Sequence, residues 1–452
     1  MTSPSSDQTI CALASGVPPA GIAVLRVSGS AVQSFAKAHL DQALPLPHMA
    51  RLRKVRDQKG EIVDEALTLF MPAGASYTGE DVLELHLHGG IAVVEHALET
   101  LTSFSGIRLA EPGEFTRRAF EAGRMDLTQA EGIADLIEAE TRGQKAQALA
   151  QTDGALGALY SDWRESLLAA LALLEVSVDF PDEAEAPQMV NVPVLKNLRA
   201  LADAFETALK DGVTDQSIRD GFRVAIIGAP NVGKSTLLNR LAKREAAIVT
   251  DIPGTTRDVV EVRCRMAGQI VWFADTAGLR ETKEVVEAEG VRRAKRMAET
   301  SDLRLYVGVE NEPSLLPPSE VPSPRPHDLY IQNKTDLEVN ETLKADRSAG
   351  SIKISALTGE GFEALERALE RWLIEQTANR AAPVITRARH RIGIETALAN
   401  VRAGIALIEQ DVGAELASED VRLAARALAG LVGEIGVEEI LGAVFSEFCI
   451  GK

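Results

Sequence analysis

Hydrophobic and polar residues alternate in the first part of this chain with the short period of β-strands and, between those stretches, with the longer period of helices. Glycine and proline separate the stretches, as they do between the elements of small mixed domains. We therefore expect an α+β domain over residues 1–120. Its predicted strands are Gly21–Ser28, Ala66–Met71 and Val82–His88, and its predicted helices are Ala31–Leu40 and Ile91–Phe104.

After this domain the apolar residues step by three and four, which predicts helices. The helical pattern covers residues 121–215, where an acidic break at Asp182–Pro187 precedes a helix that ends at Leu209, and it returns over residues 378–452. Between these blocks, residues 216–377 alternate between strand-like and helix-like segments, as in a nucleotide-binding α/β domain. We therefore predict a multidomain α+β protein whose central helical domain is interrupted by an inserted α/β domain.

Composition narrows the classes of function. The formal charge of −18 at pH 7 argues against nucleic-acid binding over the whole surface, because phosphates are attracted by an excess of lysine and arginine. The three cysteines are far apart and odd in number, which argues against a disulfide framework and fits a reducing compartment. No apolar run reaches the length of a membrane span, and the first residues do not look like a secretory signal. We therefore expect a cytoplasmic protein that does not enter a membrane.

The segment Arg223–Thr236 (RVAIIGAPNVGKST) combines an apolar strand, a glycine-bearing loop and the start of a helix. It contains the P-loop pattern G-x-x-x-x-G-K-(S/T), which Lys234 and Ser235 complete. The backbone N–H groups of such a loop, together with the helix N-terminus, cradle phosphates. Lys234 would reach the terminal phosphates, and the Ser235 hydroxyl would hold Mg²⁺. The strand before the loop and the leucines after it favour this interpretation over a chance match in a glycine-rich turn.

Four further motifs stand in the order of a GTP-binding domain. Asp251–Asp258 (DIPGTTRD) would be a switch loop whose threonine completes the magnesium shell. Asp275–Gly278 (DTAG) ends an apolar strand and would hold Mg²⁺ through water and meet the γ-phosphate. Asn333–Asp336 (NKTD) follows another strand, and its aspartate can accept two hydrogens from guanine that adenine does not offer. Ser355–Leu357 (SAL) would back guanine O6. Together with the P-loop these motifs predict a Ras-like GTPase domain.

One usual catalytic group is missing from these motifs. Ras-like proteins orient the attacking water with a glutamine after the DxxG region, but Leu279 occupies that position here. Asn231 offers a carbonyl oxygen near the β/γ bridge and could help to hold a monovalent cation that neutralises the developing charge. It could equally serve the loop conformation alone, since asparagine tolerates left-handed backbone. The residues predicted to contact GTP are Asn231, Val232, Gly233, Lys234, Ser235, Thr236, Thr250, Asp251, Ile252, Pro253, Gly254, Thr255, Thr256, Asp275, Thr276, Ala277, Gly278, Asn333, Lys334, Asp336, Ser355, Ala356 and Leu357.

Polar residues interrupt two predicted strands of the N-terminal domain. Arg26 is a charge within an otherwise apolar strand. Glu84, His86 and His88 share one face of another strand because they alternate with leucines. A solvated strand face, or a polar pocket wall with a charged floor, would explain these residues. A metal site at the two histidines is disfavoured, because no cysteine or acidic partner stands at ligand spacing.

Over its whole length the chain resembles the MnmE (TrmE) family of tRNA-modification GTPases. Six segments match the family, and two of them, which contain PGEFTRRAF and FCIGK, are far more specific than the motifs that many GTPases share. The six are SYTGEDVLELHLHGG (76–90), PGEFTRRAFEAGRMDLTQAE (112–131), GAPNVGKST (228–236), DIPGTTRD (251–258), DTAGLRET (275–282) and FCIGK (448–452). Two stretches depart from the family pattern: the entry before the first strand is shortened to SGVPPAG (15–21), and the proline-rich loop 313–326 is atypical.

The resemblance implies that the N-terminal domain builds a homodimer and binds a tetrahydrofolate derivative, 5-formyl- or methylene-tetrahydrofolate, as one-carbon donor. The residues that match the folate-pocket positions are Arg26, Glu84, Arg124 and Lys452. Arg124 stands where lysine is common, which keeps the charge but changes the hydrogen-bond geometry. The C-terminal Cys449 would lie near the donor, where a thiol could act as nucleophile or stabilise an intermediate.

The resemblance also implies that the GTPase domains of two subunits meet across K⁺. The matching K⁺ ligands are Asn231, Thr250, Ile252 and Thr255, and the Mg²⁺ ligands are Ser235 and Thr256. In the family a glutamate downstream of DxxG takes over the role of the missing glutamine. The matching residue is Glu287, which would orient the attacking water through a second water.

By the same resemblance the partner is the FAD-dependent MnmG (GidA) protein, with which the chain would form a heterotetramer. Together they would add a carboxymethylaminomethyl-type group to C5 of the wobble uridine of certain tRNAs. The acidic charge suggests to us that much of the tRNA contact falls to the partner. The alternative function is a ribosome-assembly or RNA-binding switch GTPase, which shares the nucleotide motifs; such proteins usually append basic RNA-binding modules, and the sequence shows none.

Overall fold

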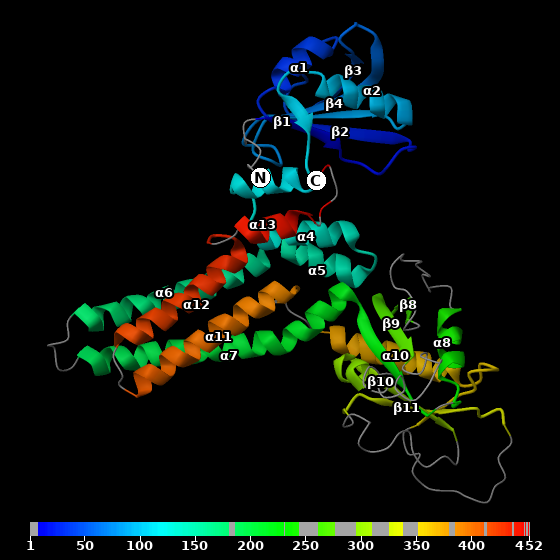
Figure 1. The fold of residues 1–452 in the computed structure, drawn as a ribbon, viewed down its shortest axis with the longest axis vertical. Helices are drawn as coiled ribbons and strands as arrows, with labels where there is room; N and C mark the ends of the chain where they lie inside the picture. Colours follow the sequence, from blue (N-terminus) through cyan, green and yellow to red (C-terminus); the bar gives the residue numbers. More distant parts are fainter. Residues whose placement is uncertain are drawn as a thin grey trace, which may run out of the picture. The chain divides into compact units, whose positions relative to one another are not determined.

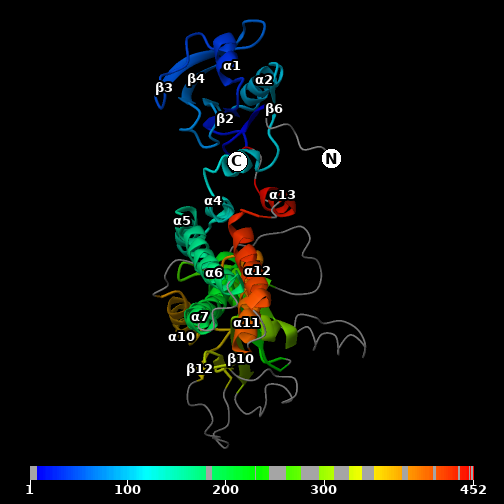
Figure 2. The same ribbon diagram turned by 90° about the vertical axis from the view of Figure 1, so that its left-hand side faces the viewer.

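The structure is a computed structural model. It describes residues 8–179, 186–229, 231–243, 261–275, 295–309, 325–337, 351–378, 385–410, 414–435, 438–446, 448 and 451. The chain divides into two compact units (Figures 1 and 2). One comprises Met1–Ala134, Gln151–Leu198 and Ala399–Lys452, and the other comprises Asp135–Ala150 and Arg199–Leu398.

The first unit begins with a six-stranded sheet in the order β3-β4-β5-β2-β1-β6, antiparallel except for the β1–β6 pair. Apolar side chains of alternate strand positions, such as Leu25 and Leu85, pack against α1 and α2 in one core. The elements are β1 Thr9–Leu13, β2 Ile22–Ser28, α1 Val32–His39, β3 Ala50–Arg56, β4 Ile62–Met71, β5 Val82–His88, α2 Ile91–Thr102 and β6 Ile107–Leu109. The predicted α+β domain is confirmed.

The rest of the first unit is helical and joins segments from both ends of the chain. Helix α6 packs along α12, and both figures show them side by side. Leu127 and Ala130 of α4 share a core with Phe445 and Phe448 at the C-terminal end. The helices that lie wholly or mostly in this unit are α3 Glu114–Glu121, α4 Leu127–Glu138, α6 Ala155–Asp179, α12 Ala414–Val432 and α13 Glu438–Ser446. Segments from both helical blocks of the sequence therefore pack together in this unit.

The second unit contains a sheet in the order β12-β11-β10-β7-β9-β8, parallel except for the edge strand β8. Its central strands are buried, as parallel strands covered by helices must be. The elements of this unit are α5 Arg142–Thr152, α7 Ala186–Asp220, β7 Phe222–Ile227, α8 Lys234–Ala242, β8 Glu261–Met266, β9 Gln269–Asp275, β10 Leu303–Val309, β11 Leu329–Asn333, β12 Ile352–Lys353, α10 Phe362–Thr377 and α11 Ala388–Glu409. The first part of α7 and the second part of α11 belong to the first unit. This confirms the predicted α/β domain.

Helix α7 is longer than predicted, because it continues beyond Leu209 to Asp220. Tertiary contacts explain the extension. Ile218 is buried in the core of the α/β domain, and the Ser217 hydroxyl donates to Asp302 at 2.8 Å. These contacts outweigh the weak helix propensity around Gly212. None of the described helices combines the length and the apolar character needed to cross a membrane.

Candidate functional site

The P-loop follows directly from the buried strand β7. Two of its residues adopt left-handed backbone, Asn231 with φ 67° and Gly233 with φ 97°, which curls the loop before α8 begins at Lys234. A Cβ on Gly233 would collide with the side-chain amide of Asn333, so only glycine fits there. Asn231 therefore has the left-handed backbone that a role in the loop conformation requires. Its side chain is exposed and so is also accessible to a cation.

Two polar contacts form the phosphate end of the site. The buried Lys234 ammonium donates to the carbonyl oxygens of Gly228 and Ala229, each at 2.7 Å, and so stays within the loop. The Ser235 hydroxyl donates to the Asp275 carboxylate at 2.7 Å. The last strand position of β9 thus meets the first turn of α8, which brings together two of the three side chains predicted at the magnesium ion, Ser235 and Asp275. Oxygen ligands of this kind suit Mg²⁺.

Asn333 links the phosphate end of the site to the base end. Its side-chain amide donates to the Val232 carbonyl at 2.8 Å, and its side-chain carbonyl accepts from the Ala356 N–H at 2.9 Å. The residue is 3% exposed. Asn333 therefore fixes the position of the P-loop relative to the SAL loop. Asp336 of the same motif remains exposed.

Arg240 is a site residue that the motifs do not reveal. It lies on α8 and donates to the carbonyls of Ala356 at 3.0 Å and Leu357 at 3.1 Å, while its guanidinium lies 5.7 Å from the centroid of the Phe362 ring. Inside the SAL loop, the Ser355 hydroxyl accepts from the Thr358 N–H. Since Arg240 and its acceptors are far apart in sequence, no local pattern could have identified this support.

Thirteen of the predicted site residues lie outside the described residues. They are Thr250, Asp251, Ile252, Pro253, Gly254, Thr255, Thr256, Thr276, Ala277, Gly278, Glu287, Cys449 and Lys452, together with most of the proline-rich loop 313–326.

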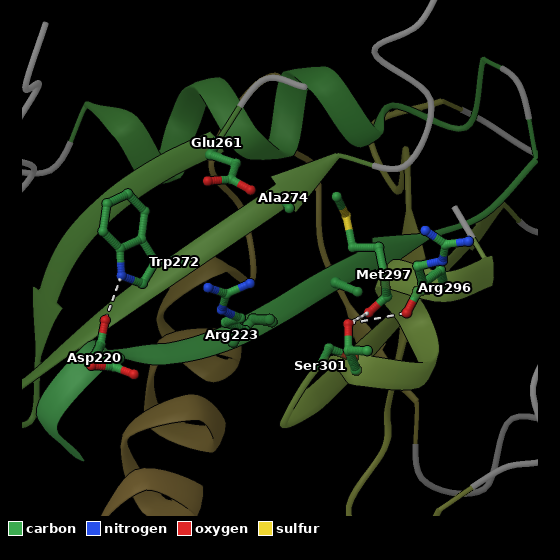
Figure 3. Close-up of a pocket in the computed structure, with 11 residues that line it drawn as sticks. Asp220, Arg223, Glu261, Trp272, Ala274, Arg296, Met297 and Ser301 are labelled. Carbon is green, nitrogen blue, oxygen red and sulfur yellow. Dashed lines mark hydrogen bonds between the residues drawn. The ribbon is translucent and has the colours of Figure 1, made fainter. Parts of the chain in front are cut away.

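A cavity of about 370 Å³ lies on one face of the same sheet (Figure 3). Eleven residues line it, among them Arg223 of β7 and Trp272 of β9. None of the residues predicted to contact GTP is among them. The indole N–H of Trp272 donates to the carbonyl of Asp220 at 3.0 Å, which fixes the ring at the edge of the cavity. This cavity is distinct from the nucleotide site.

In the N-terminal domain, antiparallel pairing of β2 with β5 places Arg26 opposite Glu84. The guanidinium donates to the carboxylate at 2.9 and 3.0 Å and lies 5.7 Å from the ring centroids of Tyr77 and Phe115. His86 shares the same carboxylate at 3.3 Å. These contacts favour a polar wall with a charged pair over a merely solvated strand face.

The predicted residues His88 and Arg124 form hydrogen bonds with other partners. His88 hydrogen-bonds Asp64 instead, at 3.0 Å. Arg124 donates to the Gly74 carbonyl at 2.8 Å. Among the described residues no group of three histidine, cysteine, aspartate or glutamate side chains is placed to hold a metal.

A buried charge network supports this wall, and sequence reasoning missed it. Glu114 accepts from Arg108 at 2.6 and 2.8 Å and from Arg118 at 3.0 Å, and Arg118 also donates to Glu80 at 3.0 Å. Burial alone would raise the pKa of the Glu114 carboxyl, but the hydrogen bonds from both arginines help to hold that pKa below its usual value. The network ties α3 to the loop that carries Tyr77. Its signal in the sequence is only the charged segment PGEFTRRAF.

The C-terminal end of the chain lies against the same domain. Gly451 has φ 101°, and a Cβ there would collide with the carbonyl of Leu13 at the end of β1. In the pairing of β1 with β2, Arg26 lies opposite Ala12. Gly451 therefore lies beside β1, the strand next to β2 with its Arg26, which only the tertiary structure could show.

The fold and this geometry define a P-loop protein with the polar groups of a GTP site, fused to a helical domain and an α+β domain. Two family profiles match the chain: "GTP-binding protein TrmE N-terminus" over residues 9–124 and "MnmE helical domain" over residues 127–449. The chain belongs to the MnmE (TrmE) family of tRNA modification GTPases.

Individual relatives agree with this assignment. The chain is 54% identical over 444 residues to the tRNA modification GTPase MnmE of Hyphomonas neptunium, covering 98% of this chain and 99% of the relative. It is 48% identical to the MnmE of Parvibaculum lavamentivorans, over 98% of this chain and 100% of the relative. Among solved structures, the G domain of the T. maritima FeoB iron transporter is 21% identical and covers 34% of this chain and 98% of that chain, with a TM-score of 0.23, too low to add weight.

Proposed function

We propose that this chain is a K⁺-stimulated GTPase that acts in tRNA wobble-uridine modification. With an FAD-dependent MnmG (GidA) partner it adds a carboxymethylaminomethyl-type group to C5 of that base, with a tetrahydrofolate derivative as one-carbon donor. The GTPase role in tRNA modification follows the named relatives. The cytoplasmic location, the homodimer, the heterotetramer and the contact with tRNA through the partner are part of the proposal.

The observation that carries the proposal is the Arg26–Glu84 pair in the N-terminal sheet. The same chain has the polar groups of a GTP site in its GTPase domain. A pterin ring presents an amino-pyrimidinone edge like that of guanine, and a carboxylate can accept its two N–H groups. Glu84 offers such an acceptor, and it is held by Arg26, whose guanidinium lies over the Tyr77 and Phe115 rings. The predicted Arg124, Cys449 and Lys452 would complete this pocket.

In the GTPase domain, Ser235 and Asp275 support magnesium binding, and Asn231 is accessible to K⁺. We assign the remaining K⁺ ligands to Thr250, Ile252 and Thr255, the second magnesium hydroxyl to Thr256, and water orientation to Glu287. A cation near the β/γ bridge would supply the charge that an arginine supplies in other GTPases.

The test is a nucleoside analysis of tRNA from a strain that lacks this gene, with add-back of the chain. We expect the C5-modified wobble uridine to return with the unaltered chain and not with Glu84→Gln, although Glu84→Gln should hydrolyse GTP normally. Cys449→Ser should behave like Glu84→Gln. A normal nucleoside profile in the deletion strain, with an altered ribosome profile instead, would refute the proposal in favour of a ribosome-assembly role.

A further inference from the structure

A short piece of the helical sequence belongs to the same compact unit as the GTPase sheet. Residues 135–150, the end of α4 and most of α5, are held there by side chains that bond backbone carbonyls of α7. Gln144 donates to the carbonyl of Arg219 and Gln147 to that of Asp215, both at 2.8 Å. We call residues 135–150 the α4–α5 segment.

One carboxylate of the α4–α5 segment, that of Glu140, forms ion pairs with the edge strand of the sheet. Arg263 of the edge strand β8 donates to Glu140 through two nitrogens, at 3.0 and 2.6 Å, and Arg265 adds a third contact at 3.3 Å. The Arg263 guanidinium also lies 5.3 Å from the centroid of the Trp272 ring. The Arg263 side chain is 14% exposed, whereas that of Glu140 is 37% exposed. Bidentate pairing and cation–π stacking together fix a guanidinium better than either does alone.

The Trp272 ring is itself fixed from another direction. Its indole N–H donates to the carbonyl of Asp220, the last residue of α7, as Figure 3 shows. Arg263 and Trp272 stand directly opposite each other in the β8–β9 pairing. Glu140, Arg263 and Trp272 therefore form a continuous chain of contacts from the α4–α5 segment into the sheet.

This chain of contacts meets the sheet close to the reacting end of the nucleotide site. Strand β9 runs on from Trp272 to Asp275, which binds Ser235 of the P-loop. Strand β8 begins at Glu261, shortly after the predicted switch residues 251–258. A paired strand is stiff over so few residues. A shift of the β8–β9 hairpin would therefore move Asp275.

We propose that Glu140 is a positioning residue for GTP hydrolysis. It acts through Arg263, which it holds against Trp272, and thereby keeps the β8–β9 hairpin where Asp275 can serve the magnesium ion. The residue touches no nucleotide. Its effect should therefore fall on the hydrolytic step more than on binding, because the P-loop contacts that bind phosphates do not depend on it.

The test compares full-length variants Glu140→Ala, Glu140→Gln, Arg263→Ala and the double variant Glu140→Ala/Arg263→Ala. The matched control is Glu138→Ala, because Glu138 is an exposed glutamate at the end of α4, two residues before Glu140, with no ion pair to any described residue. For each variant we would measure kcat and KM for GTP, the dissociation constant of a fluorescent GDP analogue, and the midpoint of thermal unfolding by circular dichroism.

We expect kcat to fall about threefold to tenfold in Glu140→Ala and in Arg263→Ala, a modest effect because the ion pair is partly exposed. GDP affinity should change less than about twofold. The double variant should be no slower than the slower single variant, because both substitutions break one linkage. The kcat of Glu140→Gln should lie between that of Glu140→Ala and that of the unaltered chain. The kcat of Glu138→Ala should equal that of the unaltered chain.

Three results would overturn the inference. The first is an unchanged kcat in Glu140→Ala. The second is a loss of kcat that runs parallel to a loss of GDP affinity and of thermal stability, which would make the contact merely structural. The third is a double variant whose loss equals the product of the two single losses, since independent residues behave in that way.

Discussion

Replacing Asn333 by alanine tests whether the two ends of the nucleotide site depend on one side chain. The substitution removes the donor to the Val232 carbonyl and the acceptor of the Ala356 N–H, in a place where Asn333 is 3% exposed. Each hydrogen bond contributes about 1 kcal/mol net, and each partner left unsatisfied in a buried place costs about 1–3 kcal/mol. Allowing for water that enters the vacated space, we expect a total loss of about 2–4 kcal/mol.

That loss divides between the folding of the domain and the binding of nucleotide. If all of it fell on binding, the dissociation constant would rise about 30-fold to 800-fold. Because the P-loop and the SAL loop must be in register mainly when they hold phosphate and base together, we expect a rise of at least about tenfold.

The assay is a titration of a fluorescent GDP analogue into the full-length chain, with Gln332→Ala as the control. Gln332 precedes Asn333 on β11, points to the opposite face of the sheet, and its side chain forms no hydrogen bond with the described residues. Asn333→Asp should bind at least as weakly as Asn333→Ala, because its carboxylate would face the Val232 carbonyl. Binding of GDP by Asn333→Ala within about twofold of the unaltered chain would refute the reasoning.

Two further predictions concern pH and the cation. Because the folded-state pKa of Glu114 is lowered, its carboxylate adds stability at pH values above the unfolded pKa, and this stability is lost as the pH falls through the folded pKa. The N-terminal domain of Glu114→Gln should thus unfold about 1–3 kcal/mol more easily at neutral pH and should approach the unaltered domain in acid, as followed by circular dichroism during denaturation; a constant difference at every pH would contradict the linkage. GTP turnover should be faster in K⁺ than in Na⁺ at equal ionic strength, measured as released phosphate, and equal rates would remove the proposed cation role of Asn231.

Local pattern was sufficient to predict the fold class and the nucleotide motifs. The strand before Gly228, the leucines after Ser235 and the strand ends before Asp275 and Asn333 carry their signals within a few residues of each site. A P-loop can be predicted in this way because its geometry depends on glycine and on the adjoining strand and helix, all of which are neighbours in the sequence.

The same local signals placed the end of α7 too early, at Leu209. The helix continues to Asp220 because Ile218 is buried and Ser217 bonds Asp302, and neither contact has a signature within the helix itself. For the polar residues of the N-terminal strands, the sequence left open whether they formed a solvated face or a pocket wall. The β2–β5 register decided this by bringing Arg26 onto Glu84.

The sequence alone thus determined which elements form and which chemical groups they carry. Only the tertiary structure decided which of those groups support one another: Arg240 with the SAL loop, Arg118 with Glu80, and Glu140 with Arg263. The physical reason is that a hydrogen bond or ion pair depends on distance in space. Partners that the fold brings together from remote parts of the chain leave no periodicity for sequence reasoning to detect.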